Sequence, residues 1–106
     1  MANPQDTKIA KTLLNKISGF TEVISFKLYG SRARGDGARD SDMDIFIVVP
    51  ELTLELDRRI SAAAWEIGMD NGIVITTVVC TPADLDKPGF RGSPFLNAVA
   101  NEGVTV

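Results

Sequence analysis

Hydrophobic and polar positions follow two different periods along this chain, and each period predicts a different element. Between residues 4 and 18 the apolar residues recur at helical spacing, after Asn3-Pro4 and before Gly19. Over residues 22–29 the period is two, which is typical of a half-buried strand. The pattern therefore predicts a helix over residues 4–18 that is followed by a first strand.

The remaining chain continues the succession of strands and helices. Residues 43–49 are almost continuously apolar and end at Pro50, which indicates a strand buried on both faces. An apolar helical face extends over residues 52–71 and stops at Gly72, and residues 73–80 predict a third strand. Three shorter elements are expected at the end: a helical turn after Thr81-Pro82, a helix over residues 95–102 and an edge strand over residues 104–106.

This order of elements predicts an α/β (α+β) fold in which helices cover a small sheet. The 106 residues are about one domain's worth of chain, so we expect a single domain over residues 1–106. No apolar run reaches the length of a membrane span, and residues 1–6 do not resemble an export signal. We therefore expect a cytoplasmic protein that does not enter a membrane.

The composition restricts the chemistry that the chain can perform. It contains no histidine, which excludes Ser-His-Asp and Cys-His catalysis and any histidine-ligated zinc site. Its one cysteine, Cys80, closes a strand and is expected to be a small buried hydrophobe. The net charge of -3 argues against capture of nucleic acid by a broad basic surface. Any contact with phosphate must therefore be local.

Two acidic residues stand at the start of the second predicted strand. Asp42 and Asp44 are two positions apart, so the strand period directs both carboxylates to one face. Carboxylates held close together repel one another unless a cation or an arginine compensates their charge. Oxygen ligands of this kind suit Mg²⁺ or Mn²⁺. Asp42 and Asp44 are therefore candidate metal ligands and candidate catalytic residues.

A candidate phosphate-binding segment follows the first predicted strand. Gly30 permits close approach of the backbone, and Ser31 can donate its hydroxyl hydrogen to a phosphate. Arg32 and Arg34 bring concentrated positive charge close to the acidic pair. Each of these features alone is common in turns, caps and solvated surfaces. Their combination, on a long polar connection between two strands, indicates a site where phosphates and metal meet.

These residues resemble a known family. Residues 30–35 read Gly-Ser-Arg-Ala-Arg-Gly and residues 41–45 read Ser-Asp-Met-Asp-Ile, similar to the GSxxxG…SDxD signature of the minimal nucleotidyltransferases in the DNA polymerase β superfamily. The resemblance implies a mixed sheet with flanking helices, Ser31 and nearby amides on a triphosphate, and two Mg²⁺ ions on Asp42 and Asp44. It also implies transfer of a nucleoside monophosphate, usually AMP from ATP, to a hydroxyl, with pyrophosphate leaving.

The chain departs from the family pattern at one position. The family has a third carboxylate on the strand after the long helix, which assists metal binding or accepts the proton of the attacking hydroxyl. Here Thr76 or Thr77 occupies the expected place, and residues 72–80 contain no acid. A threonine cannot act as the base. Three explanations remain: weak catalysis, approach of another acid such as Asp84 or Asp70, or assistance by the substrate itself.

Three hypotheses for the function follow. The first is a metal-dependent nucleotidyltransferase that moves AMP from ATP to a protein or RNA hydroxyl. The resemblance to family members of this size implies, as an expectation, an antitoxin-like partner of a small helical HEPN-type protein. The second is a catalytically weak nucleotide- and Mg²⁺-binding module that regulates a partner protein. The third is a structural domain whose acidic loop binds Mg²⁺. The sequence leaves the acceptor, the nucleotide preference and the oligomeric state open.

Overall fold

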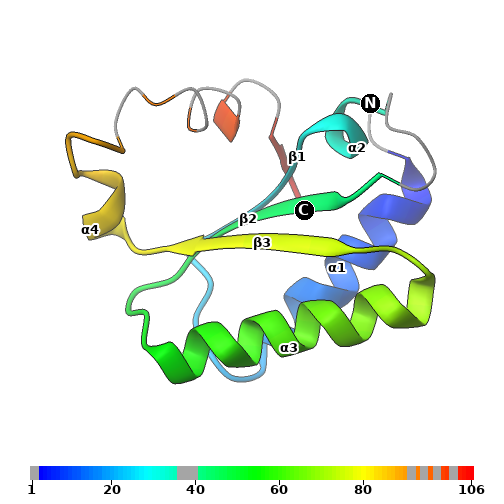
Figure 1. The fold of residues 1–106 in the computed structure, drawn as a ribbon, viewed down its shortest axis with the longest axis horizontal. Helices are drawn as coiled ribbons and strands as arrows, with labels where there is room; N and C mark the ends of the chain where they lie inside the picture. The colour runs from blue at the N-terminus through cyan, green and yellow to red at the C-terminus, as the bar shows by residue number, and fades with distance from the viewer. Residues whose placement is uncertain (1–2, 36–40, 91–92, 94–95, 97–98, 101–102) are drawn as a thin grey trace.

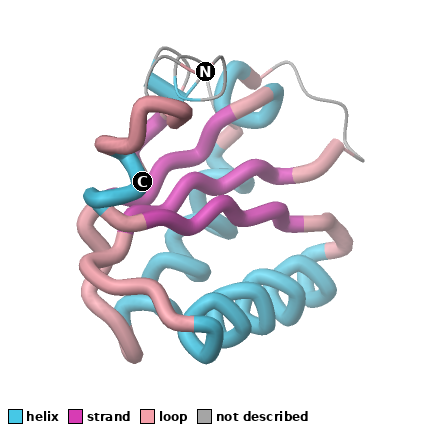
Figure 2. Tube along the Cα trace, turned by 60° about the vertical axis from the view of Figure 1, so that its left-hand side comes forward, coloured by secondary structure: helices cyan, strands magenta, loops and turns pink. Residues whose placement is uncertain are grey.

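The sheet is the centre of the structure, a computed structural model that describes residues 3–35, 41–90, 93, 96, 99–100 and 103–106. Its described strands are β1 (Ser25–Tyr29), β2 (Met43–Val48), β3 (Ile75–Cys80) and β4 (Val104–Thr105). They lie side by side in the order β3-β2-β1-β4 (Figure 2). β2 is antiparallel to β1 and parallel to β3, and β4 is antiparallel to β1. The sheet is therefore mixed.

Two long helices cover one face of this sheet, α1 (Pro4–Ser18) and α3 (Leu54–Asn71) (Figure 1). Their ends have the local chemistry that stabilises helix termini. The side chains of Asn3 and Thr53 accept hydrogen bonds from backbone N–H groups of the first turns of α1 and α3. Two short helices, α2 (Ser31–Arg34) and α4 (Pro82–Leu85), lie at opposite ends of the sheet. Within the described ranges, no helix could cross a lipid bilayer.

The strand period divides the core between the two faces of the sheet. Met43, Ile45 and Ile47 of β2 are buried against α1 and α3 in the larger hydrophobic cluster. Phe46 and Val48 point to the opposite face and belong to a smaller cluster that also contains Cys80. Asp44 shares the face of Phe46 and Val48 because it alternates with Met43 and Ile45. The acidic pair therefore lies away from the two long helices.

Most of the predicted elements are confirmed, with shorter strands. The first helix has the predicted bounds, whereas the first strand begins at Ser25 and not at residue 22. The β1 ladder starts at Ser25 because its partner there, Val48, is the last residue of β2, and Pro50 two residues further on has no N–H to continue the ladder. Cys80 is buried, as expected. Of the helix expected over residues 95–102, Leu96, Val99 and Ala100 are helical and the other positions lie outside the described residues.

Candidate active site

The polar residues singled out from the sequence meet at one end of the sheet. β1 ends there, and β2 and β3 begin there. The antiparallel register places Tyr29 opposite Asp44, and the parallel register places Thr76 opposite Asp44 on the other side. Tyr29, Asp44 and Thr76 thus form a row across three strands on one face of the sheet. In Figure 1, α2 marks this end.

Gly30 brings the candidate phosphate-binding segment close to Asp44. It has φ 76° and ψ -160°, a backbone conformation that is nearly exclusive to glycine. A methyl group at this position would lie 2.6 Å from Oδ2 of Asp44, well inside van der Waals contact. Two requirements therefore select glycine here, the backbone conformation and the close approach of the Asp44 carboxylate. The chain then turns directly into α2, whose first residue is Ser31.

The electrostatics of the two carboxylates are unfavourable in the absence of a cation. Burial raises the pKa of Asp44 above its ordinary value, and the negative charge of Asp42 raises it further. Burial likewise raises the pKa of Tyr29, with a further contribution from the charge of Asp44. Tyr29 therefore keeps its proton at neutral pH and can donate a hydrogen bond. A positive charge that enters between Asp42 and Asp44 stabilises both ionised carboxylates.

The two arginines of α2 occupy different environments. Arg34 is exposed, at the same end of the sheet as the acidic pair. Arg32 is only 8% exposed, and its Nη1 lies 2.8 Å from Oδ1 of Asp6 in α1. Its Nε and Nη2 also donate to the backbone carbonyl oxygen of Ser41, at 2.9 and 2.7 Å. The Arg32 side chain thus points into the protein, where it contacts Asp6 and Ser41.

The register of β3 against β2 decides which of Thr76 and Thr77 lies near Asp44. Thr76 lies on the face of Asp44, whereas Thr77 pairs with Ile45 and points toward the side of the long helices. Asp84 lies beyond the far end of β3, where its carboxylate accepts from the N–H of Thr81 and pairs with Lys87 at 3.1 Å. These contacts lower the pKa of Asp84, the hydrogen bonds to Thr81 most of all.

Asp70 is an exposed residue of α3, on the opposite face of the sheet from Asp44. The structure therefore brings neither alternative acid, Asp70 or Asp84, beside the acidic pair. Of Thr76 and Thr77, the two candidates for the expected place of a third carboxylate, only Thr76 shares the face of Asp44. Nothing in the arrangement of described residues replaces that group.

Two residues of this region were not expected from the sequence. Asp6 supplies the carboxylate that holds Arg32, and Tyr29 is the cross-strand neighbour of Asp44. The position of Asp6 in the first turn of an amphipathic helix indicated only a favourable helix dipole. The position of Tyr29 at the end of β1 was a signal, since antiparallel pairing with the next strand brings the end of β1 beside the start of β2.

The donor set of the site suits a hard divalent cation. Asp42 and Asp44 offer carboxylate oxygens, and burial and the charge of Asp42 both raise the pKa of Asp44, so a cation beside it would favour its ionised form. Among the described residues, no group of three or more acidic, histidine or cysteine side chains could hold a metal ion by itself. Such an ion would need further oxygen ligands, and nucleotide phosphates can supply them. The residues therefore fit a metal that arrives with a nucleotide.

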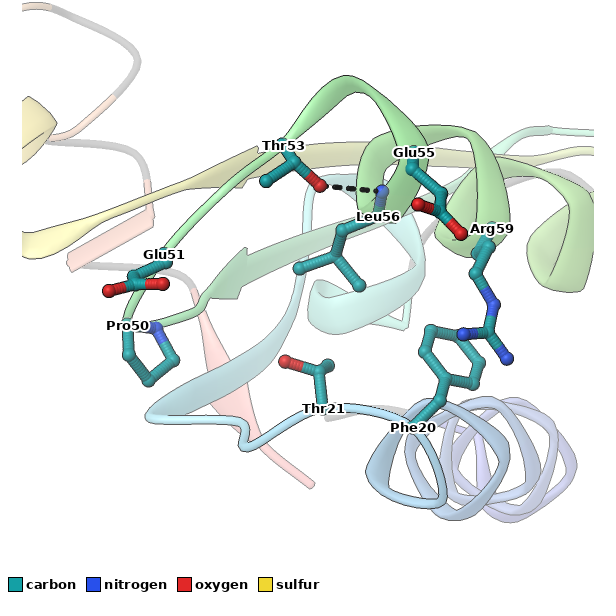
Figure 3. A pocket seen from close by; sticks show the side chains of 8 residues that line it. All are labelled: Phe20, Thr21, Pro50, Glu51, Thr53, Glu55, Leu56 and Arg59. Atoms are coloured by element: carbon teal, nitrogen blue, oxygen red, sulfur yellow. Dashed lines mark hydrogen bonds between the residues drawn. The ribbon is translucent and has the colours of Figure 1, made fainter.

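A concave pocket at the other end of the sheet has a different character (Figure 3). Its volume is about 380 Å³, and it lies where β2 leads into α3 and α1 leads into β1. The guanidinium of Arg59 lies 4.3 Å from the ring centroid of Phe20, a cation–π contact. The hydroxyl of Thr53 accepts from the N–H of Leu56 at 3.1 Å. The polar groups drawn there have partners or face solvent, and the sequence indicated no chemistry for them.

Residues 7–97 match the sequence profile of the nucleotidyltransferase domain. The chain therefore belongs to the nucleotidyltransferase domain family. Its fold is that of a structure described as a minimal nucleotidyltransferase, with a TM-score of 0.69 and 21% identity over 100% of this chain and 97% of that one. The mixed sheet with flanking helices is thus confirmed. Among curated proteins, none matches the chain significantly.

The fold also resembles that of two toxin–antitoxin structures. One, a complex with AMP-PNP, gives a TM-score of 0.59 and 16% identity over 90% of this chain and 70% of that one. The other, a mutant of the MntA-HpeT pair, gives 0.61 and 16% identity over 94% of this chain and 70% of that one. At these identities the likeness concerns the fold.

Proposed function

We propose that this chain transfers a nucleoside monophosphate, AMP from ATP, to a hydroxyl group of a protein or an RNA. The observation that carries the proposal is the close approach of Gly30 to the Asp44 carboxylate, which leaves no room for a side chain at Gly30 and brings Gly30-Ser31 beside the acidic pair. Membership of the nucleotidyltransferase domain family supports it. Nucleotidyl transfer needs positioning and charge stabilisation more than covalent participation by the protein, so a chain without histidine can perform it.

Each residue of the site has a defined task in this proposal. Asp42 and Asp44 hold Mg²⁺ or Mn²⁺, two ions when the nucleotide is bound. Bound metal would neutralise the phosphate charge and the charge that develops on the leaving pyrophosphate. Gly30 lets the nucleotide-binding segment lie against the Asp44 carboxylate, and Ser31 and Arg34 donate hydrogen bonds to the phosphates. Arg32 was expected to contact the nucleotide as well, and its buried contacts favour a different role, developed below.

The missing third carboxylate supports a second candidate function. Thr76 faces Asp44 but cannot accept the proton of an attacking hydroxyl, and neither Asp70 nor Asp84 takes its place. Loss of a general base costs about 10² to 10⁴ in rate. A nucleotide- and Mg²⁺-binding module that regulates a partner is therefore the alternative to a slow transferase. In both cases the partner that we propose is a small helical HEPN-type protein, in line with the toxin–antitoxin structures that share the fold.

A transfer assay separates the two candidate functions. The protein is incubated with Mg²⁺, ATP labelled at its α-phosphate, total RNA and the protein encoded next to it. Label on protein or RNA, absent with Asp42→Asn, is expected for a transferase. Nucleotide binding without any transfer would favour the binding module. A folded wild-type protein that binds no Mg²⁺-nucleotide would contradict both.

A further inference from the structure

One buried guanidinium connects three separate parts of the molecule that meet at the site. Arg32 belongs to α2, immediately after Ser31 of the phosphate-binding segment. Its Nη1 pairs with Asp6 of α1 at 2.8 Å, and both side chains are largely buried, at 8% and 13% exposure. Its Nε and Nη2 donate to the carbonyl oxygen of Ser41. A buried charge with these partners has a fixed position.

The contact with Ser41 bears directly on the first acidic residue. The Ser41 carbonyl belongs to the same planar peptide unit as the N–H of Asp42. Two donors of the Arg32 fork hold that one oxygen, so they fix the orientation of the peptide plane as well as its position. The plane in turn sets the direction in which the Asp42 backbone leaves the connection and enters β2. Asp42 itself is exposed and has no core packing to hold it.

We infer that Arg32 is a positioning residue, which sets the placement of Asp42 relative to Ser31 and Asp44 through the Ser41 carbonyl. The inference rests on the proposed function, since it concerns how the same metal and phosphate site is assembled. Asp6 has the supporting part, because it compensates the buried charge of Arg32 and anchors the guanidinium to α1. Loss of a residue that supports a metal ligand costs about 10-fold to 100-fold in metal affinity.

Two substitutions separate positioning from general stability. Arg32→Lys keeps a positive charge near Asp6 but removes the forked contact, because an ammonium group cannot reproduce two donors in one plane that converge on the Ser41 oxygen. Asp6→Asn keeps the forked contact with Ser41 and removes the ion pair. A matched control is Lys16→Gln, which breaks an exposed ion pair between α1 and α3, Lys16 to Glu66 at 2.7 Å, away from the site.

Three quantities are measured for each variant. They are the free energy of unfolding in urea, the dissociation constant of Mn²⁺ with a nonhydrolysable ATP analogue, and the amide chemical shifts of Asp42 and Asp44 without metal. We expect Arg32→Lys to lose about 10-fold or more in affinity and to shift the Asp42 amide, under conditions where it is folded. Asp6→Asn should lose stability with a smaller loss of affinity, and Lys16→Gln should bind like the wild type.

Each other outcome overturns the inference. Wild-type affinity in Arg32→Lys would show that the forked contact does not position Asp42. Equal losses of affinity in Arg32→Lys and Asp6→Asn would show that general loosening of α1 and α2 is responsible. A folded wild-type protein that binds no Mn²⁺-nucleotide would remove the proposed function together with this inference, whereas binding by the wild type leaves the variants to decide the inference alone.

Discussion

The two ends of the sheet differ in how well their interactions are satisfied. At the end marked by α2, burial and the charge of Asp42 make ionisation of Asp44 unfavourable, and Gly30 holds a backbone conformation that other residues avoid. At the other end, Arg59 stacks on Phe20 and Thr53 caps α3. The second end has a pocket, and the first has the candidate chemistry. Local unfavourable interactions therefore mark the end that holds the candidate site.

Introducing a carboxylate at Thr76 should have the largest effect, an increase in the rate of AMP transfer. Thr76→Asp places a carboxylate on the face of Asp44, where it can act as a base, and should raise AMP transfer by up to about 10² to 10⁴. Thr77→Asp is the matched control, since its side chain faces the long helices and the charge should destabilise the domain. The transfer rate and the thermal midpoint check both. Unchanged transfer in folded Thr76→Asp, with nucleotide bound, would favour the binding module.

Removing a carboxylate should affect the two ends differently. Asp44→Asn should weaken binding of Mg²⁺ with an ATP analogue by at least about 10-fold to 100-fold, in line with the cost of disturbing a metal site. It should also stabilise the fold slightly, because it removes a partly buried charge and its repulsion with Asp42. Glu51→Gln, in the pocket at the other end, is the control and should leave binding unchanged. Calorimetric titration measures both, and equal affinities would contradict the assignment of Asp44 as a ligand.

Two glycines with positive φ test the close approach at the site. Gly30→Ala should cost about 1 to 3 kcal/mol of stability through its backbone conformation and should also displace the Asp44 carboxylate and weaken nucleotide binding. Gly72 ends α3 with φ 69° and has open space around it, so Gly72→Ala should cost about 1 to 2 kcal/mol and leave binding intact. Urea unfolding and calorimetry compare the pair. Identical effects on binding would show that the approach of Gly30 to Asp44 is irrelevant to the site.

The pH dependence of stability should show how much the charge of Asp44 destabilises its end of the sheet. The folded-state pKa of Asp44 is raised, so its ionisation destabilises the fold as the pH rises through that pKa, and protonation removes the penalty at lower pH. The stability advantage of Asp44→Asn over the wild type should therefore be present at neutral pH and vanish in acid. Metal-nucleotide affinity should fall in the wild type over the same interval. An advantage that persists in acid would point to a cause other than charge repulsion.

The smallest effect on stability is expected at the end of the sheet where Arg59 contacts Phe20. Arg59→Ala removes the cation–π contact with Phe20 and should cost about 0.5 to 1 kcal/mol of stability. Nucleotide binding should not change, because Arg59 lies at the opposite end of the sheet from Asp44. A loss of nucleotide affinity in Arg59→Ala would abolish the distinction between the two ends. Urea unfolding with parallel titration tests both expectations.

The sequence predicted the elements and the acidic pair because these depend on local patterns. Apolar spacing defined α1 and α3, and the period of two placed Asp42 and Asp44 on one face. The role of Arg32 depends on the proximity of α1, a contact between distant parts of the chain that local spacing does not contain. From its position beside Ser31 in the sequence, Arg32 was predicted to bind the phosphates of a nucleotide.

The choice between Thr76 and Thr77 likewise could not be made from local sequence spacing. Neighbouring strand residues face opposite sides, so the choice requires the register of β3 against β2. That register is set by how the long helix returns the chain to the sheet, and an apolar run with no charged marker fits either alignment. The pairing of Asp44 with Thr76 resolved it.

The strand order has a consequence for how the chain folds. β1 pairs with β2 and β2 with β3, each the next strand along the chain, whereas β4 pairs with β1 from the opposite end of the sequence, through Lys27 with Thr105 and Leu28 with Val104. Closing the longer loop costs more chain entropy, so the strands that present Gly30 and Asp44 are favoured to assemble first. During synthesis, the frame of the site can therefore form before the final strand has left the ribosome.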